Sequence, residues 1–86
     1  MSDCIFCKIA AGDIPSSKIY EDDDVIAFKD IHPQAPVHFL IVPKKHIVSL
    51  AETQSADEPL LGKMLGLVRK LAKEQGCDNG FRVIIN

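Results

Sequence analysis

One short apolar run, Phe39 to Val42, restricts the fold more than any other stretch of this sequence. It contains β-branched residues and lies between Pro36 and Pro43, a pattern typical of a buried strand. His38 stands at the entrance to the run, and His46 follows shortly after its exit. Core packing alone does not require titratable side chains at both ends of a buried strand. The pattern therefore predicts a strand that lies beside a functional site.

Three elements are expected before this strand, which we place at His38 to Val42. A short helix is predicted from Cys4 to about Ala11, and Gly12 would end it. Two short runs of alternating polarity, Lys18 to Glu21 and Val25 to Lys29, are separated by three aspartates. This arrangement predicts a β-hairpin.

A long helix is expected after the strand, from Ser55 to Gln75. Ser55 and Glu58 have the spacing of a capping box, and a proline falls within the first turn, where its missing N–H does no harm. Gly76 would end the helix, and the apolar run Phe81 to Ile85 predicts another strand. Six apolar side chains recur at helical spacing and predict one apolar stripe: Leu60, Leu61, Met64, Leu67, Val68 and Leu71.

This order of elements predicts an α+β domain in which one short and one long helix accompany a largely antiparallel sheet. A chain of 86 residues is near the lower limit for a self-sufficient core, so we expect residues 1–86 to form a single domain. The sequence stops at Asn86, directly after an apolar β run. We therefore expect the complete polypeptide to continue beyond this residue.

Composition excludes several classes of partner. A net charge of −2 does not provide the clustered basic surface that nucleic-acid binding requires. No apolar stretch approaches the ~20 residues that span a bilayer. The N-terminus also lacks the basic and apolar regions of a secretory signal. We expect a cytoplasmic protein with neither a nucleic-acid nor a membrane partner.

The odd number of cysteines argues against a disulfide framework. Cys4 and Cys7 form a C-x-x-C pair, which indicates metal or redox chemistry in a cytosolic chain. The alternative is a pair of partly buried small residues on one helical turn. A tetrahedral zinc would need two further ligands in addition to these thiolates.

Two segments, DCIFCKIAAGDIP and IYEDDDVIAFKDIHPQAPVHFLIVPKKHI, resemble the small bacterial Hint-like branch of the histidine triad nucleotide-binding family. The resemblance extends from Cys4 to Asn86. It implies a purine nucleotide-binding protein that hydrolyses nucleoside phosphoramidates or related nucleotides through a nucleotidyl-histidine intermediate, without a cofactor in the chemistry. The family is named after a C-terminal His-x-His-x-His motif. The three histidines of this sequence, His32, His38 and His46, are not spaced in that way.

The resemblance also assigns roles to individual residues. Asp30 would accept hydrogen bonds from the ribose hydroxyls, and His38 would support the triad without acting as the nucleophile. Zinc, where present, would be structural and bound by Cys4, Cys7 and His46 together with a triad histidine. The nucleotide-binding positions implied are Ile5, Phe6, Phe28, Asp30, Ile31 and Asn86. From the residues alone, core packing explains the four apolar side chains, a turn explains Asp30, and a satisfied core histidine explains His38.

Three functions remain open at this point. The first is a histidine triad hydrolase whose catalytic strand follows Asn86. The second is a non-catalytic nucleotide-binding module, and the third is a zinc-stabilised interaction domain. The resemblance further implies a two-fold symmetric homodimer that pairs the strand Phe81 to Ile85 across the axis. Such pairing would cover an otherwise exposed strand edge.

Overall fold

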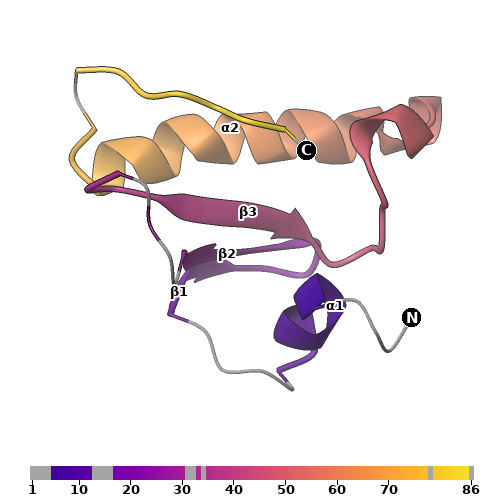
Figure 1. Cartoon of the computed structure of the whole chain (residues 1–86). Helices are drawn as coiled ribbons and strands as arrows, with labels where there is room; N and C mark the ends of the chain where they lie inside the picture. The colour runs from indigo at the N-terminus through magenta and orange to yellow at the C-terminus, as the bar shows by residue number, and fades with distance from the viewer. Residues whose placement is uncertain (1–4, 13–16, 31–32, 34, 78, 86) are drawn as a thin grey trace. The chain divides into compact units, whose positions relative to one another are not determined.

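The computed structural model describes residues 5–12, 17–30, 33, 35–77 and 79–85, and it groups the chain into two compact units, Met1–His46 and Ile47–Asn86 (Figure 1). The first unit contains one short helix and three strands: α1 (Ile5–Ala10), β1 (Lys18–Glu21), β2 (Val25–Lys29) and β3 (Phe39–Pro43). The second contains two 3-10 helices and one long α-helix: η1 (Leu50–Glu52), η2 (Ser55–Asp57) and α2 (Glu58–Glu74).

The three strands form one antiparallel sheet in the order β1-β2-β3. The predicted hairpin is confirmed at its predicted bounds, and β3 lies one residue later than predicted. β2 is the central strand, and its residues Val25, Ile26 and Ala27 are fully buried. A strand that is buried on both faces is continuously apolar, which explains the uninterrupted sequence VIAF.

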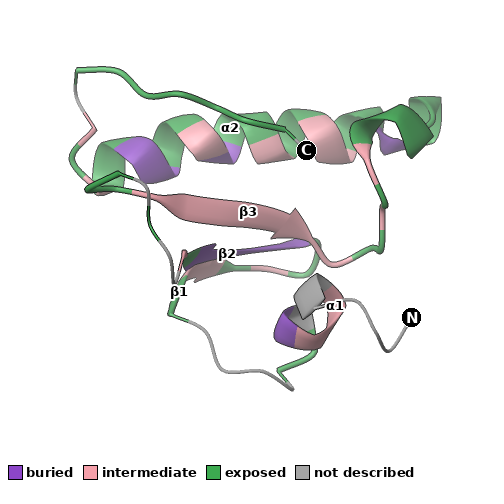
Figure 2. Ribbon diagram, in the orientation of Figure 1, coloured by how far each residue is buried: buried purple, intermediate pink, exposed green. Residues whose placement is uncertain are grey.

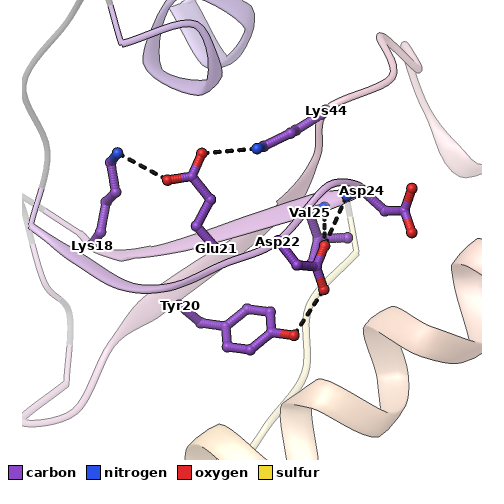
Figure 3. Close-up of polar contacts among 7 residues, drawn as sticks. All are labelled: Lys18, Tyr20, Glu21, Asp22, Asp24, Val25 and Lys44. Atoms are coloured by element: carbon purple, nitrogen blue, oxygen red, sulfur yellow. Dashed lines mark hydrogen bonds and ion pairs between the residues drawn. The ribbon is translucent and has the colours of Figure 1, made fainter.

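Asp22 organises the turn between β1 and β2 (Figure 3). Its Oδ1 accepts hydrogen bonds from the backbone N–H of Asp24 at 2.8 Å and of Val25 at 3.0 Å. Its Oδ2 accepts a hydrogen bond from the Tyr20 hydroxyl at 2.7 Å. One short side chain thus satisfies two turn amides and ties the turn to β1, as aspartate commonly does in turns.

A register shift between Lys18 and Tyr20 in β1 produces an unusual pairing of charges. Residues three apart on a regular strand point to opposite faces, but an irregularity returns them to the same face. Lys18 Nζ consequently lies 3.0 Å from Glu21 Oε1, and Lys44 Nζ lies 2.8 Å from Glu21 Oε2 (Figure 3). Hydrogen bonds from Lys44, and then from Lys18, hold the pKa of the Glu21 carboxylate below its ordinary value of 4.5.

One face of the sheet packs against α1. Ile9 of α1 is 8% exposed and forms a buried cluster with Ile26 and Phe28 of β2. Leu40 and Val42 of β3 pack against this cluster, and they are the cross-strand partners of Phe28 and Ile26. The even-numbered residues of both strands therefore face α1.

The start of α2 differs from the predicted capping box. The box is formed by Gln54 and Asp57, with the Gln54 backbone N–H donating to Asp57 Oδ2 at 3.0 Å, and not by Ser55 and Glu58. The reason is that a 3-10 turn, η2, precedes the α-helix and moves the N-cap one residue toward the N-terminus. The proline in the first helical turn is confirmed, at the first or second position.

The apolar stripe of α2 is confirmed, because all six predicted residues are buried or half-buried while the opposite side of the helix is exposed (Figure 2). Gly76 ends the helix with φ = 84°, a left-handed conformation that favours glycine. Its N–H donates to the carbonyl of Lys73 at 3.1 Å, and the Cys77 N–H donates to Ala72 at 2.9 Å. These two bonds form a Schellman motif. Among the described residues, no helix is both long and apolar enough to cross a bilayer.

The predicted strand from Phe81 to Ile85 is wrong, since these residues have no regular secondary structure. Their side chains nonetheless include four exposed large hydrophobic groups, on Phe81, Val83, Ile84 and Ile85. β-propensity stabilises a strand only where a neighbouring strand supplies hydrogen bonds and packing. The sequence of residues 81–85 has high β-propensity, but it does not specify which strand these residues would pair with.

Candidate functional site

A row of side chains on the α1 face of the sheet changes from apolar to polar at one end. Phe28 and Leu40 are cross-strand partners, and the ladder of β2 and β3 ends one pair later, at Lys29 and Phe39. If the register of the two strands is continued by one residue, the next pair is Asp30 and His38, whose backbones are joined by a hydrogen bond. Because side chains alternate between faces, this pair lies on the face of Phe28 and Leu40.

Asp30 and His38 make both a backbone and a side-chain contact. The Asp30 N–H donates to the His38 carbonyl at 3.1 Å. Asp30 Oδ2 lies 3.5 Å from His38 Nε2, within ion-pair range but longer than a full hydrogen bond. The side chains are 23% and 31% exposed, respectively, so both are accessible to a ligand. This rung places an anionic acceptor and an imidazole directly beside the apolar cluster that contains Phe28 and Leu40.

Of the predicted base-binding residues, the structure describes the side chain of Phe28, which is 5% exposed and forms part of the core cluster. The side chains of Ile5 and Phe6 lie outside the described part of the molecule, as do Ile31, Asn86 and His32. Ile9 and Leu40 adjoin Phe28 on the same face, although the sequence did not single them out. Leu40 could have been predicted from the sequence, because side chains alternate between the two faces of a strand and Leu40 follows His38 by two residues.

The predicted metal ligands Cys7 and His46 lie close together although they are 39 residues apart in sequence. Cys7 Sγ, in α1, lies 3.0 Å from His46 Nδ1, which follows β3. Thiolate and imidazole are the ligands that zinc prefers. Cys4 lies outside the described residues, and within those residues no group of three His, Cys, Asp or Glu is arranged to hold a metal ion.

The two lysines after β3 differ in their surroundings. Lys45 is exposed, as expected of a solvated turn residue, while Lys44 is partly buried and pairs with Glu21. Lys44 also continues the strand pairing, since its N–H donates to the Asp24 carbonyl at 2.8 Å. Its charge is thus used within the sheet, in the ion pair with Glu21.

Comparison with known proteins identifies relatives along the whole chain. The family model described as "Scavenger mRNA decapping enzyme C-term binding" matches residues 3–85. Protein HitA of Neisseria gonorrhoeae is 50% identical over 86 residues, which are 100% of this chain and 80% of that protein. A "14 kDa zinc-binding protein" of Brassica juncea is 44% identical over an aligned region that includes 98% of this chain and 76% of that protein.

The fold is also that of solved relatives. A histidine triad protein from Clostridium difficile superposes with a TM-score of 0.94 at 52% identity, covering 100% of this chain and 76% of that structure. The antiparallel sheet and the long helix described above are therefore elements of a known fold. With matches of this identity over the full chain, the protein belongs to the histidine triad family.

Proposed function

We propose that this chain binds a purine nucleotide on the α1 face of its sheet, with the ribose on Asp30. The observation that carries the proposal is the continuity of the row, in which the apolar pair Phe28 and Leu40 is followed at once by the Asp30–His38 rung. A purine needs an apolar surface, and its ribose needs an acceptor for two vicinal hydroxyls. A carboxylate provides several acceptor positions for such donors.

The chemical step that we propose for the whole protein is hydrolysis of a nucleoside phosphoramidate or a related nucleotide. A histidine of the His-x-His-x-His motif would attack the α-phosphorus, forming a P–N bond as the leaving amine departs with a proton. Water would then cleave the nucleotidyl-histidine. A neutral imidazole is a competent nucleophile near neutral pH. The 86 residues contain no such motif, so their part in this reaction is to bind the nucleotide, with His38 supporting the motif.

The nucleotide proposal is tested by calorimetry with adenosine or guanosine monophosphate. Asp30→Ala should weaken binding by about 1–3 kcal/mol, because the ribose hydroxyls lose a charged acceptor. Asp23→Ala is a matched control, since Asp23 is an exposed turn carboxylate. Equal affinities for the Asp30→Ala variant and the control would refute the ribose assignment.

A second function, zinc binding, is favoured by the contact between Cys7 and His46. Tetrahedral bonds of ~2.3 Å to sulfur and ~2.0 Å to nitrogen separate the two ligand atoms by roughly 3.5 Å. The observed 3.0 Å is slightly shorter, so a small rotation of either side chain would admit the ion. The name of the Brassica juncea relative supports this assignment. Bound zinc would link α1 to the end of β3, as expected for a zinc-stabilised domain.

Elemental analysis of protein that was never exposed to chelator tests this second function. We expect up to one zinc per chain, and we expect Cys4→Ser and His46→Ala each to lower both zinc content and melting temperature. If the protein contains no zinc, the zinc proposal is refuted and packing alone explains the two cysteines. Cys77→Ser is the matched control, because Cys77 lies in the second unit of the chain, away from the proposed ligands in sequence.

We also propose that the protein is a cytoplasmic homodimer. The support is the exposed apolar segment Phe81 to Ile85, which a second copy would cover. Leu65 on α2 is likewise exposed. Apart from the adjacent residues and the backbone of its own helix turn, a Cβ atom at Gly66 would meet no atom within 4 Å, so a side chain at this position starts in open space. Light scattering should therefore show a shift of Gly66→Leu toward monomer or aggregate, whereas a wild-type monomer at micromolar concentration would contradict the proposal.

A further inference from the structure

We infer that Glu21 is a positioning residue for His46, on which it acts through Lys44, and that it thereby strengthens zinc binding. The inference rests on the second function proposed above, in which Cys7 and His46 are ligands. Glu21 is the last residue of β1, and Lys44 directly follows β3. Lys44 also lies two residues before His46, and all four residues belong to the first unit of the chain. Lys44 therefore connects the sheet to the segment that carries the imidazole.

The turn between β1 and β2 holds Lys44 at two points. Its backbone N–H donates to the Asp24 carbonyl at 2.8 Å, and its Nζ lies 2.8 Å from Glu21 Oε2 (Figure 3). The backbone bond continues the sheet by one residue beyond the end of β3. Lys45 and His46 belong to no helix or strand. Lys44 is thus the residue at which the sheet restrains the chain that leads to His46.

The Glu21 carboxylate is oriented by a second cation. Lys18 Nζ lies 3.0 Å from Oε1, so each carboxylate oxygen faces its own lysine. Hydrogen bonds from Lys44, and then from Lys18, lower the pKa of Glu21, which keeps the carboxylate charged at neutral pH. The side chains of Lys18, Glu21 and Lys44 are 48%, 34% and 30% exposed, respectively. Ion pairs with this exposure have moderate effects, so loss of one should change a coupled binding equilibrium by about 2- to 5-fold.

Restraint of Lys44 matters because the imidazole must be held in one place to bind the metal. Each residue extends the chain by at most about 3.6 Å, so the His46 Cα stays within about 7 Å of the Lys44 Cα. In the structure, His46 Nδ1 lies 3.0 Å from Cys7 Sγ. A segment that moves freely at residue 44 must lose that freedom when zinc binds, and this loss lowers affinity. The ion pair removes part of the freedom before the metal binds.

Zinc affinity of the full chain, measured by competition with a chelator, tests the inference. Glu21→Gln and Lys44→Met each remove one charge of the pair, and both should weaken zinc binding by about 2- to 5-fold. A general attraction between the protein and the cation predicts opposite signs, since loss of a lysine would then strengthen binding. Lys44→Arg keeps the pair and should stay near the wild-type affinity. Asp23→Asn is the matched control, because it removes an exposed carboxylate from the same turn.

Three results would overturn the inference. The first is stronger zinc binding by Lys44→Met, and the second is an affinity of Glu21→Gln equal to that of the Asp23→Asn control. The third is a double variant, Glu21→Gln with Lys44→Met, whose loss equals the sum of the two single losses. Two residues that act as one pair give coupled effects, so the double variant should be about as weak as either single variant.

A measurement without metal separates this inference from the zinc proposal. The nuclear Overhauser effect between a Cys7 Hβ and the His46 Hε1 should be weaker in metal-free Glu21→Gln than in metal-free wild type. Wild-type protein that binds no zinc overturns the zinc proposal, and the Overhauser effect then decides the positioning role by itself: a weaker effect in the variant supports it, and equal intensities refute it. If Glu21→Gln does not fold, Lys44→Met provides the same two measurements.

Discussion

Replacement of Ile9 by alanine tests how α1 is held on the sheet. A helix of six residues is too short to be stable alone in water, so α1 depends on tertiary contacts. Ile9 is its one described side chain in the buried cluster, at 8% exposure. Truncation of a buried isoleucine destabilises a protein by about 2–5 kcal/mol. We expect about 2–3 kcal/mol, because a short terminal helix adjusts to part of the cavity. The melting temperature should then be about 8–24 °C lower.

The same substitution should lower zinc affinity at the proposed metal site, although it does not change a ligand. Cys7 lies on α1 two residues before Ile9, so a loosened helix no longer holds Cys7 Sγ beside His46. We expect zinc affinity, measured by competition with a chelator, to fall together with the urea midpoint. Lys8→Ala is the control, since it changes the intervening residue outside the cluster. An Ile9→Ala midpoint equal to that of the control would refute the packing argument, and reduced stability with unchanged zinc affinity would refute its link to Cys7.

Three further substitutions test local features of the fold. Asp22→Ala removes an acceptor of three hydrogen bonds and should destabilise the protein by about 1–3 kcal/mol in urea titrations, whereas Asp23→Ala should have little effect. Glu21→Gln should lower the melting temperature at neutral pH and low salt. Because the folded-state pKa of Glu21 is lowered, this difference should disappear as the pH falls below 4.5, and a difference that persists in acid would contradict the ion-pair explanation. Gly76→Ala should cost about 1 kcal/mol, since alanine is strained at φ = 84°; an unchanged midpoint would contradict this.

Elements that depend on nearby residues were predictable from the sequence. The hairpin follows from two short strand-like runs around an aspartate turn, and the end of α2 follows from Gly76. The capping box was misplaced by one residue, because glutamine is a less common N-cap than serine and the 3-10 turn has no strong signature. The segment Phe81 to Ile85 was misassigned for a different reason: strand formation depends on a partner that lies elsewhere.

The candidate site was predictable only in part, because its contacts join distant residues. Asp30 and His38 were each singled out, but their contact depends on the register of β2 and β3, which neither sequence run specifies by itself. The proximity of Cys7 and His46 was implied by the family resemblance and could not be obtained from spacing, since 39 residues separate them. Single residues were therefore identifiable from their local sequence, while pairs required the fold.

Phe28 shows why the polar rung is the better place to test binding. At 5% exposure it is part of the core, so its truncation to alanine should destabilise the protein by about 3–5 kcal/mol whatever its role toward a base. A loss of nucleotide affinity in that variant would not separate binding from folding. Asp30 and His38 lie one rung further along the same face and are partly exposed. Substitutions there leave the buried cluster intact, so a change in nucleotide affinity at this rung would report binding itself and would support the proposed ribose contact.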